Sequence, residues 1–240
     1  MKESRELQEL VTIIRSKRMA KSPPGKLLSR VYLEIKRKRH YMGYRCWELL
    51  VEQLATYLGI TKTKDMKLFR ELKPLLEHYI IAAQNNPWDH IGQLYMDQGL
   101  TGPGQNMTPR FITEMMCKMT IGEKSGKKVE TVLDPCVGSG RFLISATLLF
   151  PEKPLVLFGI EIVPSLYRAC LVNMKMFSNH PYYILCADSL RIDNKNGMDP
   201  RIWKYANTWE IHDVSQFYWK PPPIWHDRFS LKAFTELKEK

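Results

Sequence analysis

The sequence lacks the features that would place the protein in a membrane or outside the cell. Its 240 residues contain no uninterrupted run of about 18 apolar residues, the length that a membrane-spanning helix needs. The N-terminus MKESRELQEL is polar and charged, unlike a secretory signal. We therefore expect a cytoplasmic protein that has no membrane partner.

Metal-ligand and phosphate-loop motifs are missing as well. The five cysteines are scattered, without a C-x-x-C pair or a histidine-rich segment, so we expect reduced thiols and no metal site. No Gly-Lys-Ser or Gly-Lys-Thr is present, which excludes the phosphate loop of nucleoside triphosphatases.

Basic charge is plentiful and concentrated near the N-terminus. The net charge is +11, and residues 1–45 contain 13 Lys or Arg against 4 Glu. Such a surplus indicates an acidic partner, most commonly nucleic acid. Basic residues are densest in a run that lies beside several aromatic residues. The members of this run are candidates for contact with DNA phosphates, and they are Lys36, Arg37, Lys38 and Arg39. The alternative is that this run forms a solvated helix face.

Helical patterns fill residues 1–100, which we interpret as a basic helical domain. Two amphipathic patterns are joined at Gly59, an arrangement that resembles a helix-turn-helix. In that interpretation Thr63, Lys64 and Lys67 would point toward DNA. An ordinary helical bundle packed against the rest of the chain is the alternative.

Strands and helices alternate in the second region, residues 101–240. The strands are expected at residues 129–133, 155–160 and 182–186, and the helices at 141–150 and 165–177. Alternation of this kind predicts an α/β domain, in which crossover helices connect the strands of a parallel sheet.

A glycine-rich turn follows the first expected strand, in the stretch LDPCVGSGRF. The strand ends at Asp134, and Gly138 and Gly140 lead into a helix, where doubly wound sheets bind ligands. Leu143 replaces the third glycine of a dinucleotide fingerprint. Because Asp134 would repel a pyrophosphate at short range, the ligand should be cationic. S-adenosylmethionine fits, since its ammonium and sulfonium groups are positive.

Acidic residues also end the second and third expected strands. Glu161 follows Gly140 by 21 residues, where a carboxylate can accept both ribose hydroxyls. Asp188 ends the third strand and can accept a hydrogen bond from an adenine amino group. Each acid alone could be a helix cap or a surface residue, but three at successive strand ends favour a ligand site.

Four segments together resemble the N6-adenine DNA methyltransferases, in particular the modification subunits of type I restriction-modification systems. The segments are GQNMTP at 104–109, LDPCVGSGRFLISA at 133–146, GIEIVPSLYRACLVNM at 159–174 and ADSL at 187–190. The resemblance implies a Rossmann-like methyltransferase fold, S-adenosylmethionine as cofactor and DNA as partner.

The resemblance also implies roles for individual residues. Those implied to bind the cofactor are Thr108, Pro109, Asp134, Gly138, Gly140, Glu161 and Asp188. Thr108 and Pro109 would border the methionine moiety, and Asp134 would hold its ammonium. The alternative for Thr108 and Pro109 is a helix N-cap followed by a proline in the first turn.

The sequence departs from the family at the catalytic motif. The family's Asn-Pro-Pro-aromatic motif accepts hydrogen bonds from the target amine and stacks on a flipped base. Here the nearest stretch is FYWKPPPIW, with Lys220 in place of the asparagine, and an ammonium cannot accept a hydrogen bond. The remaining candidates for a catalytic role are Tyr218, Trp219 and Lys220.

We therefore expect an S-adenosylmethionine-binding, DNA-associated protein whose catalysis is lost or depends on a partner. One alternative is an active adenine-N6 methyltransferase in which Tyr218, Trp219 or Trp225 stacks on the base. Another is a helix-turn-helix regulator that has a vestigial methyltransferase fold. Only 52 residues follow Asp188, so we expect an incomplete sheet whose edge is covered by the C-terminal segment, another subunit or a second copy.

Overall fold

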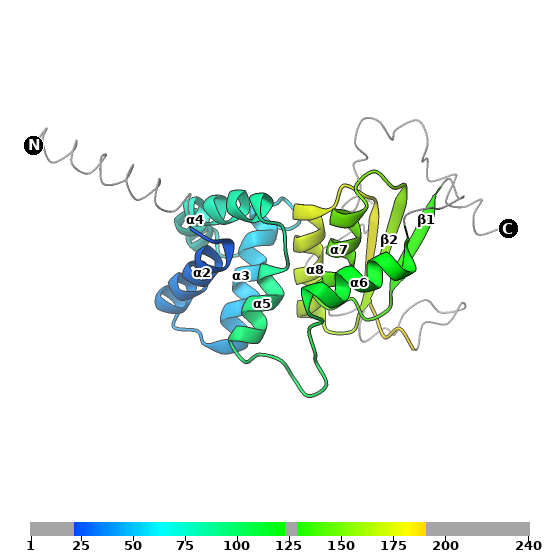
Figure 1. Ribbon diagram of the computed structural model, residues 1–240. Coiled ribbons are helices and arrows are strands. Elements are labelled where there is room, and N and C mark those ends of the chain that lie inside the picture. The colour runs from blue at the N-terminus through cyan, green and yellow to red at the C-terminus, as the bar shows by residue number, and fades with distance from the viewer. Residues whose placement is uncertain (1–21, 123–128, 191–240) are drawn as a thin grey trace, which may run out of the picture.

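A computed structural model describes residues 22–122 and 129–190 (Figure 1). Its first four helices are α2 (Pro24–Arg39), α3 (Gly43–Tyr57), α4 (Met66–Asn85) and α5 (His90–Asp97). The second part contains α6 (Arg110–Thr120), β1 (Glu130–Asp134), α7 (Arg141–Leu149), β2 (Leu155–Glu161), α8 (Pro164–Phe177) and β3 (Tyr182–Cys186). No helix in these two ranges combines the length and the apolar character needed to cross a bilayer.

The helical part is built on apolar stripes with helical spacing. Leu27, Val31 and Ile35 recur every four residues on α2 and are fully buried. On α3, Trp47 is also fully buried, and its indole nitrogen donates to the carbonyl of Ile91 over 3.4 Å. The aromatic ring of Trp47 thereby fixes α3 against α5, the helix that leads to the second part of the chain.

The connection between α3 and α4 differs from the expected helix-turn-helix. It spans residues 58–65, longer than the three or four residues typical of that motif. Thr63 is buried and its hydroxyl is engaged by the side chains of Gln53 and Glu52, both on α3. The prediction that Thr63 faces DNA is therefore wrong, because its hydroxyl is used inside the bundle.

The sheet is parallel, in the order β1-β2-β3. Helix α7 connects β1 to β2, and α8 connects β2 to β3, as the alternation in the sequence predicted. In Figure 1, α6, α7 and α8 lie on the side of the sheet that faces the helical part. Because the strands are parallel, their carboxyl ends lie at the same end of the sheet.

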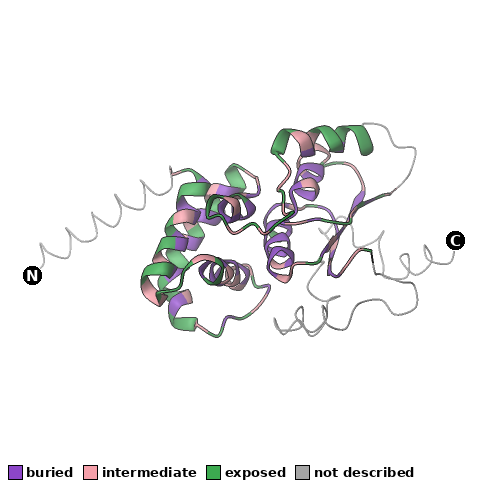
Figure 2. Cartoon of the chain, turned by 90° about the horizontal axis from the view of Figure 1, so that it is seen from below, coloured by how far each residue is buried: buried purple, intermediate pink, exposed green. Residues whose placement is uncertain are grey.

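The two parts share a continuous apolar core, in which α8 is central. This helix packs against β2 and β3 and also against α3 and α5. Ala169, Cys170 and Val172 on α8 are fully buried, and the same cluster includes Leu50 and Leu54 of α3. Figure 2 shows the buried residues along the facing sides of the helices, with exposed residues on the outer faces.

Strand β1 lies at one edge of this sheet. Among the described residues it pairs only with β2, and Leu133 on it is 58% exposed. An apolar edge of this kind is a surface that another strand can join. That a further subunit or a second copy covers it stays a prediction.

Candidate functional site

The glycine-rich turn lies between the carboxyl end of β1 and the start of α7. The backbone N–H of Val137 donates to the carbonyl of Ile160 (2.9 Å), which attaches the turn to β2. Gly138 and Gly140 have φ angles of 56° and 97°, a region that side chains rarely tolerate. A Cβ on Gly140 would also lie 3.0 Å from the sulfur of Cys170. The turn needs both glycines for backbone reasons alone.

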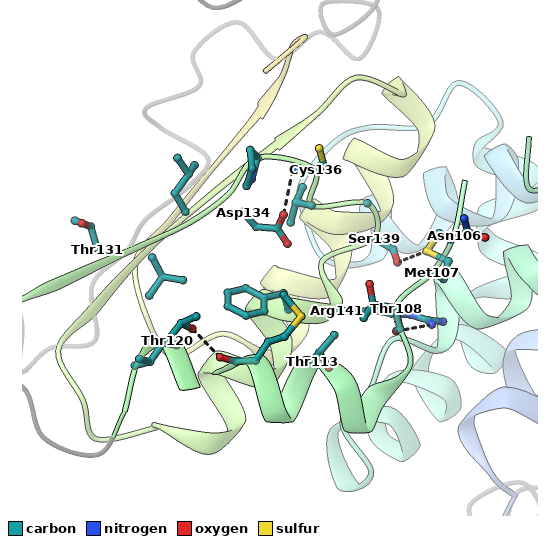
Figure 3. Close-up of a pocket in the computed structure, with 18 of the residues that line it drawn as sticks. Asn106, Met107, Thr108, Thr113, Thr120, Thr131, Asp134, Cys136, Ser139 and Arg141 are labelled. Carbon is teal, nitrogen blue, oxygen red and sulfur yellow. Dashed lines mark hydrogen bonds between the residues drawn. The ribbon is translucent and has the colours of Figure 1, made fainter. Parts of the chain in front are cut away.

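A cavity of about 530 Å³ opens beside this turn, between α6 and β1 (Figure 3). Three of the residues predicted to bind a cofactor line it together, namely Thr108, Asp134 and Gly138. The other four lie outside its lining, and these are Pro109, Gly140, Glu161 and Asp188. The residues predicted to bind a cofactor therefore do not all line one cavity.

The carboxylate of Asp134 is shielded from water, and few hydrogen bonds or charges offset the cost of burying it. Its Oδ1 accepts a hydrogen bond from the backbone N–H of Cys136 (3.0 Å), drawn in Figure 3. Burial nevertheless raises the pKa of Asp134, and the single amide bond offsets this only in part. No Lys, Arg or His nitrogen of the described residues lies within 4.0 Å of this carboxylate. A cationic ligand would supply the missing charge.

Glu161 ends β2 and is bound to the same turn. Its Oε2 accepts from the N–H of Gly138 (2.8 Å) and its Oε1 from the N–H of Val163 (2.7 Å). Burial raises the pKa of Glu161, and the nearby charge of Asp134 raises it further. Two carboxylates with raised pKa values therefore lie at adjacent strand ends.

Asp188 follows β3 at the same end of the sheet as Asp134 and Glu161. It is half-buried, and its Oδ1 accepts from the N–H of Leu190 (3.0 Å), two residues ahead. That local bond holds the loop in a turn typical of aspartate. The third acid is thus near the other two strand ends, as expected for residues that follow parallel strands.

The segment that contains Thr108 leads into α6. The side-chain oxygen of Gln105 accepts from the N–H of Gly102 (2.8 Å) and from the hydroxyl of Tyr95 (3.3 Å), which holds the loop against α5. Pro109 itself occupies the N-cap position of α6 and no side chain caps this end. The alternative that Thr108 is the N-cap is therefore wrong by one residue.

A buried polar network behind the turn was not predicted from the sequence. The fully buried carboxylate of Asp89 accepts hydrogen bonds from Ser139, Arg141 and Asn173. Arg141 also donates to the carbonyl of Thr108 (3.1 Å). The capping position of Asp89 before α5 is readable in the sequence, but its partners lie 50 or more residues away.

The basic cluster near the end of α2 is largely paired within the helical part. Arg37 contacts Glu34, Lys38 contacts Glu71 at 2.6 Å, and Arg39 contacts Asp65 through two nitrogens at 2.6 and 2.8 Å. The remaining DNA-contact candidates are exposed and form no ion pair with a described residue, and they are Lys36, Lys64 and Lys67. The candidates for DNA contact thus fall into a group that is paired with acids and a group that is not.

The candidates for catalysis, Tyr218, Trp219 and Lys220, lie outside the described residues, as does Trp225. The structure therefore leaves their predicted roles untested. The described part of the site consists of the cavity, the glycine turn and the three strand-end acids.

Comparison with known proteins gives this site a family. Residues 93–209 match the sequence profile of the N-6 DNA methylase family. This part of the chain is therefore similar to the N-6 DNA methylases. The matched range contains the segment at 104–109, the glycine turn and the three strand-end acids, so the family resemblance inferred from those motifs is confirmed. No curated protein sequence matches the chain.

A solved structure is similar to the chain in its fold. A protein from Listeria monocytogenes described as a class I S-adenosylmethionine-dependent methyltransferase matches with a TM-score of 0.50 and 17% identity, over 73% of this chain and 54% of its own. The chain therefore spans about half the length of that protein. The predicted Rossmann-like fold of class I methyltransferases is confirmed.

A second structure is the type I restriction-modification system methyltransferase subunit from Streptococcus thermophilus. It matches with 17% identity and a TM-score of 0.42, over 71% of this chain and 40% of its own.

Proposed function

We propose that the protein binds S-adenosylmethionine at the carboxyl ends of β1, β2 and β3. The observation that carries this proposal is the carboxylate of Asp134, which lines the cavity and has a raised pKa. The adjacent acid Glu161 adds to the need for a cation, because burial and the nearby charge of Asp134 both raise its pKa. A ligand ammonium beside Asp134 would relieve both effects.

The surrounding residues fit the rest of such a cofactor. Gly138 lacks a Cβ and only the sulfur of Met107 lies near that position, at 3.9 Å, so a ligand can approach the backbone. Glu161 accepts amide bonds from Gly138, Val163 and Ile162, and a carboxylate has about four acceptor positions, so a position remains for a ribose hydroxyl. Thr108 and Pro109 would border the methionine moiety, and Asp188 would accept from the adenine amino group. When bound, S-adenosylmethionine supplies an electrophilic methyl group.

Calorimetry with S-adenosylmethionine tests the pocket directly. We expect the wild-type protein to bind, and Asp134→Ala to weaken binding at least tenfold because the charge partner of the ammonium is lost. The matched control is Asp65→Asn, which alters a carboxylate that already has an arginine partner, Arg39. Absence of heat with the wild type, or equal affinity for Asp134→Ala, would contradict the proposal.

We propose further that the helical part contacts DNA. This is supported by the N-6 DNA methylase family of residues 93–209 and by the exposed charges of Lys36, Lys64 and Lys67. Cations that have no carboxylate partner are the ones available to replace condensed counterions on DNA. The prediction of DNA contact by Arg37, Lys38 and Arg39 has less support, because each of them already contacts an acid.

Methyl transfer to adenine N6 is proposed to be lost, or to depend on a partner. The support is the sequence itself, since no Asn-Pro-Pro-aromatic segment occurs in its 240 residues. Without those acceptors, the target amine lacks the groups that would orient its lone pair. A partner that supplies them could also cover the exposed edge of β1.

Transfer of labelled methyl from S-adenosylmethionine to adenine-containing DNA tests this second proposal. We expect no incorporation above background with the chain alone. Incorporation that Asp134→Ala abolishes would instead show an active adenine methyltransferase that has a divergent motif. Calorimetry on the same samples separates a failure of catalysis from a failure of cofactor binding.

A further inference from the structure

The carboxylate of Asp89 is fully buried at the start of α5, behind the glycine turn. Its Oδ1 accepts from the backbone N–H of Gly92 (2.7 Å) and from the side-chain amide of Asn173 (2.7 Å). Its Oδ2 accepts from the hydroxyl of Ser139 (2.6 Å) and from Nε of Arg141 (2.8 Å). All four acceptor positions of the carboxylate are therefore in use.

These four donors come from three separate stretches of the chain. Gly92 belongs to α5, Ser139 and Arg141 to the turn and the first residue of α7, and Asn173 to α8. The amide of Asn173 also donates to the backbone carbonyl of Ser139 (2.8 Å). One carboxylate, which does not itself line the cavity, thus holds the turn.

Arg141 extends the same network to the other wall of the cavity. Its Nη1 donates to the carbonyl of Thr108 (3.1 Å), and its guanidinium lies 5.5 Å from the ring centre of Trp88. Both the turn that contains Gly138 and the segment that contains Thr108 are consequently tied to Asp89, one directly and one through Arg141. Figure 3 shows the bond between Arg141 and Thr108.

The approach of α5 to the turn is too close for any side chain at Gly92. A Cβ there would lie 2.0 Å from Oδ2 of Asp89 and 2.3 Å from the hydroxyl oxygen of Ser139. Both of those atoms are buried and hydrogen-bonded, so they cannot move aside without breaking the network. Gly92 is not among the described glycines that have a positive φ, so its backbone conformation would accept another residue. It is the close contact with Asp89 and Ser139 that requires glycine here.

We propose that Asp89 is a positioning residue for the cofactor pocket, through which the helical part sets the distance between the glycine turn and the Thr108 segment. This inference rests on the proposed S-adenosylmethionine site. Hydrogen bonds to a buried carboxylate are strong and directional, so they fix the geometry of the groups that make them. Neutralising Asp89 leaves Arg141 buried without its counter-ion, which would let both walls of the cavity shift.

Asp65 provides a matched control for this position. It caps α4 by accepting from the N–H of Leu68, three residues ahead, and it binds an arginine, Arg39. Asp89 caps α5 by accepting from Gly92, also three residues ahead, and binds Arg141. The change from Asp to Asn removes the same kinds of interaction at both sites, but only Asp89 touches the glycine turn.

The experiment measures S-adenosylmethionine affinity by calorimetry and stability by thermal unfolding for wild type, Asp89→Asn and Asp65→Asn. We expect both variants to melt earlier. Only Asp89→Asn should weaken binding at least tenfold, whereas Asp65→Asn should stay within twofold of wild type. Wild-type affinity in a folded Asp89→Asn protein would overturn the proposal, as would equal weakening in both variants.

The thiol of Cys136 gives a readout that needs no ligand. Cys136 lies in the turn and is exposed, whereas the other four cysteines are buried and burial raises their pKa. A thiol reagent should therefore label Cys136 first. We expect faster labelling in Asp89→Asn than in wild type or Asp65→Asn, because the turn is no longer held. An unchanged rate would overturn the inference.

This second readout also separates the two proposals. If the wild type does not bind S-adenosylmethionine, the proposed function fails, while the labelling rates still decide whether Asp89 holds the turn. If Asp89→Asn does not fold, Ser139→Ala replaces it, since this change removes one hydrogen bond to Asp89 and leaves the ion pair with Arg141. At least a threefold faster labelling of Cys136 is then expected, and no change would overturn the inference.

Discussion

The aspartates compared in the helical part and at the strand ends differ in whether they have a basic partner. Asp65 in the helical part has an arginine at 2.6 Å, and this partner lowers its pKa. At the strand ends, Asp134 has one backbone amide and no basic partner among the described residues, and burial raises its pKa. The first arrangement stabilises the fold, whereas the second keeps a charge available at some cost in stability.

Two glycines of the helical part differ in a related way. Gly59 follows the C-cap of α3 and has a φ of 72°, and a Cβ there would meet nothing within 4 Å. Gly92 has an ordinary backbone, and a Cβ there would overlap Asp89 and Ser139. One glycine is required by its own dihedral angle, the other by the close packing of α5 on the turn.

Substitution of these two glycines should have the largest effect on stability. We expect Gly92→Ala to lower the free energy of unfolding by about 3 kcal/mol or more, because it breaks a buried ionic network. Gly59→Ala should cost about 1 kcal/mol, the strain of a left-handed residue in open space. Urea unfolding of both variants checks this, and similar losses would show that the network behind the turn is not tightly packed.

The two aspartates should respond to neutralisation with opposite signs. At pH 7, Asp134→Asn should raise the unliganded free energy of unfolding by about 0.5–1 kcal/mol, since a desolvated charge is removed. Asp65→Asn should lower it by about 1 kcal/mol, because the N-cap carboxylate of α4 and its ion pair are lost. Thermal unfolding without ligand measures both, and a destabilised Asp134→Asn would show that its charge is already compensated.

The pH dependence of these differences supplies the control. The pKa of Asp134 is raised from its ordinary value of 3.8, so the folded state holds its proton longer than the unfolded state does. Its contribution to stability is therefore present below 3.8 and is lost as pH rises through the raised pKa. For Asp65, whose pKa is lowered from 3.8, stability is lost as pH falls through the lowered value. The advantage of Asp134→Asn should shrink toward pH 4.

Charge changes on the outer surface of the helical part should have the smallest effects. We expect Lys36→Ala, Lys64→Ala and Lys67→Ala each to weaken DNA binding about two- to fivefold and to reduce its salt dependence, by loss of one phosphate contact. Fluorescence anisotropy at several salt concentrations measures this. Arg37→Ala is the matched control, because Arg37 is paired with Glu34. Salt-independent binding, or a larger loss in Arg37→Ala, would contradict the proposed contact surface.

Much of the α/β part could be predicted because its signals are local. A run of β-branched and aliphatic residues that ends in Asp134, followed by two glycines, specifies a strand and a turn within about ten residues. The observed strands β2 and β3 begin at Leu155 and Tyr182, as expected from the sequence. The helical part was less accessible, since whether Thr63 faces solvent or α3 depends on how two helices pack.

The sequence by itself determined the order of strands and helices, the glycine turn and the acid at each strand end, because each of these depends on neighbouring residues. Only the tertiary structure decided which charges have partners. Arg39 meets Asp65 across 26 residues, and Arg141 meets Asp89 across 52. Those pairings depend on the packing of α2 on α4 and of α5 on the turn, and none of the cations placed by that packing forms an ion pair with Asp134 among the described residues.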